Sequence, residues 1–338
     1  MFIIHYLYYM IALITKVYLS ANSSKKTAKK ILYSFEQKFN GHFSPAAFKG
    51  IIKYQTLQQI VLNDSFAQLI GRNTNTEEKY SNTLFYIASY VYDEILDTQQ
   101  LSFEELNRLF ENPSKANPQN FNEMVLMEVH KKLLERATNS AAYFQTFLAL
   151  HNAQKDSTKQ FQASISMDEI VDITLRKGGY SAKVCSYFVS LPPSEKIEQC
   201  WYEIGSLIQM VDDLYDIYDD LQEQIHTFAN ANLDFTFIEK LFTQQISTVF
   251  NSIKELPFPD TKKQIFSTKL SLLPALGIIA LDNLGHLKNK ENQLPDLTNV
   301  ERKRLIIDME KLSNITKMLR LSYTLSKQYF KLSNLNIE

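Results

Sequence analysis

Long segments without a helix breaker constrain the fold of this chain most strongly. Only eight glycines and nine prolines occur in 338 residues, and most of the prolines gather in four short segments. These segments are residues 112–118, 191–196, 256–260 and 292–296. Between them apolar residues recur every three or four positions, as at Leu84, Ile87, Val91 and Ile95, which is the period of a helix. The sequence therefore predicts a single all-α domain, with about ten or more helices.

The charge balance excludes one large class of partners. Lys and Arg total 36 against 37 Asp and Glu, which gives a formal net charge of −1. A chain that binds nucleic acid needs a basic surplus against the phosphate backbone, so we expect no nucleic-acid partner. The only two cysteines, Cys185 and Cys200, lack the spacing of a metal knuckle. This usage is typical of a reducing compartment, and we expect a cytoplasmic protein.

The first 20 residues are apolar and are followed by the basic segment "SSKKTAKK". A secretory signal would carry its positive charge before the apolar run and a small-residue cleavage site after it. Four tyrosines, His5 and Lys16 also make residues 1–20 a poor spanning helix. We expect them to form an amphipathic helix packed on an all-α domain of residues 21–338. The alternative is that this helix lies peripherally on the inner face of a membrane.

The segment "VDDLYDIYDD" at residues 211–220 concentrates five aspartates among apolar residues. At about 100° per residue, all five fall within roughly 120° of a helix, and Gln209, Gly205 and Trp201 continue the stripe upstream. Carboxylates one turn apart, about 6 Å, repel by about 3 kcal/mol per pair at an effective dielectric near 20. A recessed face therefore needs protons or a cation, and these hard oxygen ligands suit Mg²⁺. If the face is open to water, solvation alone suffices.

A second acidic cluster lies in "SYVYDEILDTQQ". Asp93, Glu94 and Asp97 share a narrow arc of the predicted helix, and Tyr86 and Tyr90 continue that arc upstream. Two such helices could face each other and hold metal ions between their carboxylates. Tyr86, Tyr90, Trp201 and Gln209 would then form the wall of a pocket.

The segment "ITLRKGGYSAK" places Arg176 and Lys177 before Gly178 and Gly179. Two glycines within a helix cost about 2 kcal/mol relative to alanines, so we expect the helix to break there. Free backbone amides at a break, together with two cations, would bind a diphosphate.

These three elements resemble the class I isoprenoid synthase superfamily, which includes trans-prenyl diphosphate synthases, squalene and phytoene synthases and class I terpene cyclases. "GSLIQMVDDLYDIYDD", from Gly205, is similar to the second aspartate motif of the prenyl synthases, and Asp212, Asp216 and Asp220 match the spacing of the cyclases' second metal motif. "DEILD", from Asp93, resembles the first aspartate-rich motif, with glutamate in place of its second aspartate. "RKGG" resembles the prenyl synthases' lysine motif.

The resemblance implies an all-α helical bundle with a deep central apolar pocket and three Mg²⁺ ions, which stabilise the diphosphate leaving an allylic prenyl diphosphate. It implies a catalytic set of Asp93, Asp97, Asp212, Asp216 and Lys177. It implies that the metal ligands are Asp93, Glu94, Asp97, Asp212, Asp213, Asp216 and Asp220. Arg176, Lys177 and Gly178 would bind the substrate diphosphate.

The chain departs from the chain-elongating enzymes in three places. Their arginine pair is absent from the segment after Asp97, which reads "DTQQLSFEE". Their N-terminal basic stretch is matched only weakly, by "AAFKGIIKY", and no basic loop follows Asp220. These departures favour a single-substrate terpene synthase, whereas the glycine and glutamine before Asp212 favour a prenyltransferase.

The same residues leave two further functions open. One is a chain-elongating or head-to-head synthase, and the second is a decayed binding protein of the same fold. A di-iron bundle is disfavoured because its Glu-x-x-His motif occurs once, at Glu223 and His226. A homodimer is compatible with the resemblance.

Overall fold

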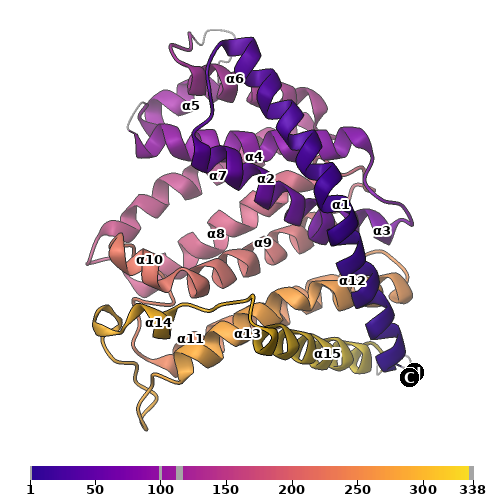
Figure 1. The fold of residues 1–338 in the computed structure, drawn as a ribbon, viewed down its shortest axis with the longest axis vertical. Coiled ribbons are helices and arrows are strands. Elements are labelled where there is room, and N and C mark those ends of the chain that lie inside the picture. The colour runs from indigo at the N-terminus through magenta and orange to yellow at the C-terminus, as the bar shows by residue number, and fades with distance from the viewer. Residues whose placement is uncertain (1, 99–100, 112–116, 335–338) are drawn as a thin grey trace. The chain divides into compact units, whose positions relative to one another are not determined.

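A computed structural model describes residues 2–98, 101–111 and 117–334 of the chain (Figure 1). This part is 78% helical and contains no strand, which confirms the prediction of an all-α protein. The proline-rich segments that the structure describes fall in connections between helices, because proline can neither donate the backbone hydrogen bond nor fit inside the helix.

The chain divides into two compact units. The first comprises Met1–Tyr9, Thr146–Val184 and Pro192–Glu338, and the second comprises Met10–Gln145 and Cys185–Leu191. Three helices contribute to both: α1 (Phe2–Phe39), α7 (Ser140–Ser157) and α8 (Met167–Ser186). The N-terminal helix therefore continues well beyond residue 20, where we expected the apolar helix to end.

The second unit is centred on α4 (Thr76–Asp97), which packs against α2 (Pro45–Gln58) and α6 (Phe121–Arg136). Leu84, Ile87, Val91 and Ile95 of α4 are all fully buried, so the apolar period read from the sequence marks the buried face of this helix. The remaining elements are the π-helix η1 (Gln59–Asn63), α3 (Asp64–Leu69) and α5 (Phe103–Glu111).

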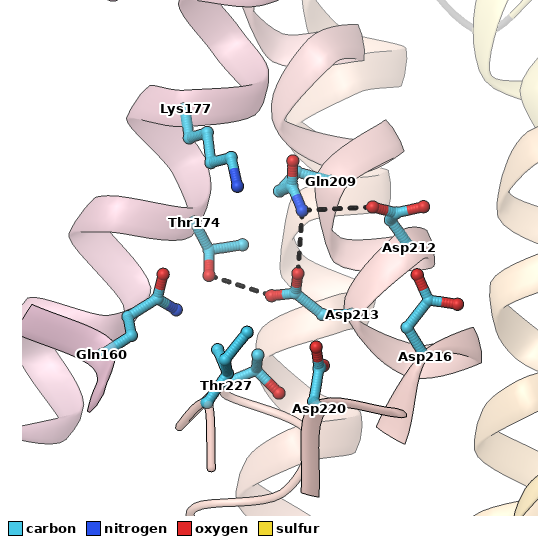
Figure 2. A pocket seen from close by; sticks show the side chains of 10 residues that line it. Gln160, Thr174, Lys177, Gln209, Asp212, Asp213, Asp216, Asp220 and Thr227 are labelled. Carbon is cyan, nitrogen blue, oxygen red and sulfur yellow. Dashed lines mark hydrogen bonds between the residues drawn. The ribbon is translucent and has the colours of Figure 1, made fainter. Parts of the chain in front are cut away.

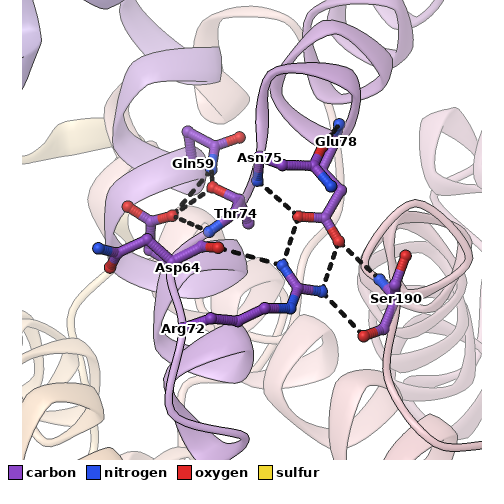
Figure 3. A network of polar contacts seen from close by, with 8 residues as sticks. Gln59, Asp64, Arg72, Thr74, Asn75, Glu78 and Ser190 are labelled. Carbon is purple, nitrogen blue, oxygen red and sulfur yellow. Dashed lines mark hydrogen bonds and ion pairs between the residues drawn. The ribbon is translucent and has the colours of Figure 1, made fainter.

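A polar network fixes the start of α4 (Figure 3). Asn75 and Glu78 form a capping box, in which each side chain accepts a hydrogen bond from the backbone N–H of the other. Arg72 donates to both oxygens of Glu78 at 2.7 Å and also to the Ser190 carbonyl. The neighbouring Asp64 carboxylate accepts hydrogen bonds from the backbone N–H and the side chain of Thr74. These charge-assisted contacts tie α4 to the connections around it.

In the first unit, α9 packs against α11 and α13, and α13 packs against α15. The long apolar faces of α9 and α11 supply much of this core. Its elements after α8 are α9 (Glu195–Tyr215), α10 (Ile217–Gln222), α11 (Phe235–Glu255), α12 (Asp260–Leu270), α13 (Leu272–Gly285), η4 (Leu297–Asn299), α14 (Arg302–Leu305) and α15 (Leu312–Asn334). The short 3₁₀-helix η3 (Thr158–Phe161) precedes α8.

Helix α8 runs without interruption through Gly178 and Gly179, so the expected break at the glycine pair is wrong. The glycines serve a packing contact instead. A Cβ on Gly178 would collide with the backbone oxygen of Gly205 on α9, and a Cβ on Gly205 would collide with the backbone oxygen of Gly178. A Cβ on Gly179 would meet the ring of Tyr202. The two helices approach closely because neither has a side chain at the contact.

Substituting alanine for Gly178 or Gly205 should destabilise the protein, because the added methyl group meets backbone that cannot move aside. We expect a loss of about 1–3 kcal/mol in the free energy of unfolding, measured by urea denaturation. Gly285→Ala is the matched control, since its Cβ would meet only the edge of the Phe235 ring, at 3.0 Å. Equal stability of the Gly178→Ala variant and the wild type would contradict this account of the helix contact.

Candidate functional site

A small polar cavity of about 110 Å³ opens in the first unit where α8 meets the end of α9 (Figure 2). Four aspartates and one lysine line it. The full lining is Gln160, Thr174, Lys177, Gln209, Asp212, Asp213, Asp216, Asp220, Ile225 and Thr227. We refer to these ten residues as the acidic cavity. Ile225 is the one apolar residue in this lining.

The four carboxylates reach the cavity because the backbone keeps helical spacing across the end of α9. Helix α9 ends at Tyr215 and α10 begins at Ile217, yet the N–H of Asp216 still donates to the Asp212 carbonyl at 2.9 Å. The N–H of Asp220 donates to the Asp216 carbonyl at 2.8 Å. The one-turn spacing read from the sequence therefore places Asp212, Asp216 and Asp220 along one wall. Asp219 is exposed and does not line the cavity.

Asp213 is held by two side chains, one from its own helix α9 and one from α8. Gln209 Nε2 donates to its Oδ1 at 2.9 Å, and Thr174 Oγ1 on α8 donates to its Oδ2 at 3.0 Å (Figure 2). Burial nevertheless raises the pKa of Asp213 to about 6, because these hydrogen bonds and the charge of Lys177 offset only part of the desolvation. Both oxygens of Asp213 are thus committed within the protein, and its role as a metal ligand stays a prediction.

Asp220 is the most strongly perturbed group of the cavity. Burial, followed by the negative charges of Asp213, Asp216 and Asp212, raises its pKa to about 8. Its Oδ2 is buried and has no hydrogen-bond partner among the described residues. The pKa of Asp212 is also raised, first because the surrounding protein desolvates the carboxylate and then because of the negative charge of Asp213. A bound cation or proton would therefore stabilise the carboxylates of this cavity.

Lys177 is the only basic side chain that lines the cavity (Figure 2). It lies one turn after Thr174 on α8, so the same face of the helix supplies both a cation and a hydroxyl donor. Its charge lowers the pKa values of Asp212, Asp213 and Asp220, without cancelling the effect of burial. One ammonium group faces four carboxyl groups.

Arg176 and Gly178 do not line the cavity. Arg176 is paired with Asp156, at 3.0 Å, and with Asp172, at 2.7 Å, so two carboxylates already occupy its guanidinium. Gly178 is buried against Gly205 inside a continuous helix, where its N–H belongs to the helix and is not freed by a break. Of the three residues expected to bind diphosphate, the structure brings only Lys177 to the acidic cluster.

The four residues predicted to form the pocket wall do not line one cavity. Gln209 lines the acidic cavity, whereas Trp201, two helical turns earlier on α9, is fully buried and does not. Tyr86 and Tyr90 belong to the second unit, where the Tyr86 hydroxyl donates to Gln58 and the Tyr90 ring lies against Gly50. The central apolar pocket stays a prediction.

The second acidic cluster lies near the C-terminal end of α4, in the second unit. Asp93 is exposed, and Glu94 is half-buried with an Oε2 that has no hydrogen-bond partner in the described part of the chain. The side chain of Asp97 lies outside the described residues. The pairing of this cluster with Asp212, Asp216 and Asp220 stays a prediction.

The sequence did not reveal Gln160, Thr174, Ile225 and Thr227. Thr174 could have been found, since it lies three positions before Lys177 on the same helical face. Ile225 and Thr227 lie in the loop after α10, and Gln160 lies in the short helix η3. Gln160 Nε2 donates to the His226 carbonyl at 3.0 Å, and the His226 N–H donates to the Gln160 carbonyl at 2.8 Å. This reciprocal pair places His226 in the loop after α10, off any helix, which also disfavours a helical Glu-x-x-His iron site.

The donor chemistry of the acidic cavity fits Mg²⁺. Within the described ranges, no group of three or more His, Cys, Asp or Glu residues is placed to hold a metal ion by itself. Mg²⁺ is usually held by one or two carboxylates, with the remaining ligands supplied by water and substrate phosphates, so it does not require such a group. The partnerless Oδ2 of Asp220 and the exposed carboxylates of Asp212 and Asp216 are oxygen donors of the right kind.

No protein-family model matches the chain, and no curated protein matches it either.

The raised pKa values predict how stability depends on pH in the absence of metal. A carboxyl group whose pKa is higher in the folded than in the unfolded state binds extra protons when folded, so stability falls as pH rises between the two values. For Asp213 and Asp220 this window extends from the ordinary value of 3.8 to about 6 and about 8, respectively. We expect the chelator-treated protein to be less stable at about pH 8 than at about pH 5.

The variant Asp220→Asn should reduce this loss, because the amide cannot ionise. The measurement is the midpoint of urea denaturation at the two pH values, with Asp219→Asn as the matched control that removes an exposed charge one residue away. A pH dependence that is the same in Asp220→Asn and in the wild type would show that Asp220 is not the perturbed group.

Proposed function

We propose that this chain is a Mg²⁺-dependent class I isoprenoid synthase that ionises an allylic prenyl diphosphate, with a single-substrate terpene synthase as the favoured form. The observation that carries the proposal is the acidic cavity. Asp212, Asp216 and Asp220 share one wall at one-turn spacing, Lys177 lies among them, and Asp220 has a buried oxygen without a partner in the described part of the chain. The alternatives are a prenyltransferase and a decayed member of the fold.

Each part of the cavity has a role in this proposal. Asp212, Asp216 and Asp220 would hold Mg²⁺, which when bound neutralises the charge that develops on the departing diphosphate. The Lys177 ammonium would pair with a diphosphate oxygen. Gln209 and Thr174 hold Asp213 in place, so they act as positioning residues. None of these groups needs to attack the substrate, because loss of diphosphate leaves an allylic cation without a protein nucleophile.

The second acidic cluster enters the proposal through Asp93 and Glu94. Glu94, like Asp220, has one buried carboxylate oxygen without a hydrogen-bond partner in the described part of the chain. We propose that Asp93, Glu94 and Asp97 supply further metal ligands. The alternative is that they form an independent solvated end of α4, in which case Asp93→Asn would leave the reaction rate unchanged.

The test of function is diphosphate release by the purified protein from C10, C15 and C20 allylic diphosphates, with and without Mg²⁺ and isopentenyl diphosphate. Release that requires only Mg²⁺ and one substrate, with an extractable hydrocarbon or alcohol, would establish a terpene synthase. Release that requires isopentenyl diphosphate would establish chain elongation. No release under any of these conditions would reject the proposed activity.

Asp216→Asn should lower the rate of diphosphate release by about 100-fold or more, since it removes a charge that holds the metal at the leaving group. The Mg²⁺-induced rise in melting temperature should shrink in the same variant, which is a readout independent of turnover. Asp219→Asn is the matched control because its side chain is exposed and outside the cavity. If Asp216→Asn keeps full activity, Asp216 is not a ligand.

Lys177→Ala should weaken the apparent affinity for inorganic diphosphate by about tenfold, which corresponds to one lost charge-assisted contact. Its fold should remain intact, because Lys177 is half-buried and makes no ion pair that the structure describes. Lys196→Ala, on the exposed start of α9, is the control. An affinity equal to that of the wild type would remove Lys177 from the diphosphate site.

A further inference from the structure

Helix α1 exposes an apolar face that continues directly into a basic one. In the second unit Ile11, Ile14, Tyr18 and Leu19 are between 53% and 80% exposed. The next turns carry Lys25, Lys26, Lys29 and Lys30, all exposed. We refer to these eight residues as the α1 surface. Large aliphatic side chains so exposed on one helix mark an interaction surface more often than single scattered ones do.

The apolar and basic parts lie on the same side of the helix. At about 100° per residue, the eight side chains fall within an arc of roughly 160°. Upstream on α1, Ile3, Ile4, Leu7 and Tyr8 are 50–69% exposed and extend the same arc. The opposite side holds Tyr6, Met10 and Leu13, which are at most 5% exposed. Tyr6 is anchored there by its hydroxyl, which donates to the Leu319 carbonyl at 2.8 Å.

The charge of this helix selects the kind of partner. No aspartate or glutamate occurs before Glu36, whereas five lysines occur in the same stretch. A surface with aliphatic side chains at one end, lysines at the other and no acid complements a bilayer that contains anionic lipids. A second copy of this chain would bring lysines without any compensating carboxylate from its own α1 surface.

The geometry favours insertion into one leaflet and not a full crossing. Ile3–Phe39 and Asp260–Gly285 are both long and apolar enough to span by length and composition alone. The second is 61% buried in its most apolar window, as a core helix is, whereas the first is only 17% buried. The exposed apolar residues of α1 extend from Ile3 to Leu19, about 25 Å of helix, which is shorter than the hydrocarbon core of about 30 Å.

The polarity of the helix changes where this apolar part ends. A cavity of about 230 Å³ begins at Leu19 and is otherwise lined by polar side chains. Ser20, Ser23, Ser24 and Thr27 of α1 contribute hydroxyl groups, and Lys79 on α4 adds a cation. At about 100° per residue these hydroxyl groups lie on the side of α1 away from the α1 surface, so the cavity lies behind the helix and leaves the α1 surface free.

We propose that the α1 surface docks this protein on an anionic lipid bilayer, with the side chains from Ile3 to Leu19 entering the acyl region and Lys25, Lys26, Lys29 and Lys30 contacting the headgroups. Each lysine near such a surface contributes about 1 kcal/mol, or about fivefold in binding. The apolar side chains contribute to binding because their surface is removed from water, and this contribution does not depend on the charge of the lipid. The two parts therefore make separable predictions.

The experiment is flotation of the purified full-length protein, without detergent, with vesicles of phosphatidylcholine alone or with roughly 30% phosphatidylserine. Wild-type protein should float with the anionic vesicles, bind the neutral ones more weakly, and lose much of the difference in high salt. Wild-type protein that stays in solution with both kinds of vesicle would overturn the proposal.

A triple variant with Ile11→Ser, Ile14→Ser and Tyr18→Ser should lose binding to both kinds of vesicle, by at least about tenfold. These side chains are exposed, so the variant should keep its circular dichroism spectrum and melting temperature. The matched control carries Phe161→Ser, Leu233→Ser and Leu312→Ser, which are 44–80% exposed elsewhere in the chain, and should bind as the wild type does.

A quadruple variant with alanine at Lys25, Lys26, Lys29 and Lys30 should lose the preference for anionic vesicles by about 600-fold, at about fivefold per lysine, with little effect on binding to neutral ones. Its control has the same change in charge at exposed lysines elsewhere. These are Lys131, Lys240, Lys290 and Lys311. Equal losses in variant and control would show that net charge, and not this surface, attracts the protein.

Light scattering in the absence of vesicles tests whether a second copy of the chain covers this surface instead. A dimer that the serine variant dissociates, together with a wild type that ignores both kinds of vesicle, would make the α1 surface a contact between copies of the chain and would reject membrane docking.

Discussion

The close approach of α8 and α9 at Gly178 and Gly205 is the constraint on which the acidic cavity depends. Helices normally pack with axes 8–10 Å apart, at a distance set by the side chains between them. Here the backbones meet, and Ser206 Oγ adds a hydrogen bond to the Leu175 carbonyl at 2.8 Å. This contact brings the Thr174 hydroxyl within 3.0 Å of Asp213 on the other helix. Each glycine lowers the intrinsic stability of its helix by about 1 kcal/mol relative to alanine. The absence of a side chain is also what allows the helices to approach and the cavity to form.

The acidic cavity is unfavourable for the isolated protein and favourable for a protein that binds a cation. Burial, together with the negative charge of Asp216, raises the pKa of Asp213 to about 6, even though two side chains donate hydrogen bonds to it. Asp220 has no such donor for its Oδ2 among the described residues, and the negative charges of its neighbours raise its pKa further. Groups perturbed both by desolvation and by like charge cluster at functional sites, because a fold selected for stability alone would not assemble them.

The sequence predicted the features that depend on local periodicity and missed those that depend on contacts between distant segments. The apolar period of α4 and the one-turn spacing of Asp212, Asp216 and Asp220 follow from helix geometry alone. The glycine pair was misread because its local cost predicts a break, whereas the partner that makes glycine necessary lies on the next helix. Gln160 and Thr227 could not have been foreseen, since a single turn of 3₁₀-helix and a loop, neither of which has a detectable period, bring them to the cavity. Of the two ion pairs of Arg176, the pair with Asp172 follows from one-turn spacing on α8, whereas Asp156 lies on α7 and no local pattern points to it.

The two proposals concern different parts of the chain, and one kind of molecule connects them. A prenyl diphosphate has a charged head and a hydrocarbon tail, so it partitions between water and a bilayer as an amphiphile does. A terpene product has lost the charged head and partitions more strongly into lipid. An enzyme held on a membrane surface would take its substrate from, and return its product to, the phase in which both are concentrated. The reaction proposed for the acidic cavity needs no membrane, and the lipid binding proposed for the α1 surface needs no substrate, so each proposal stands if the other fails.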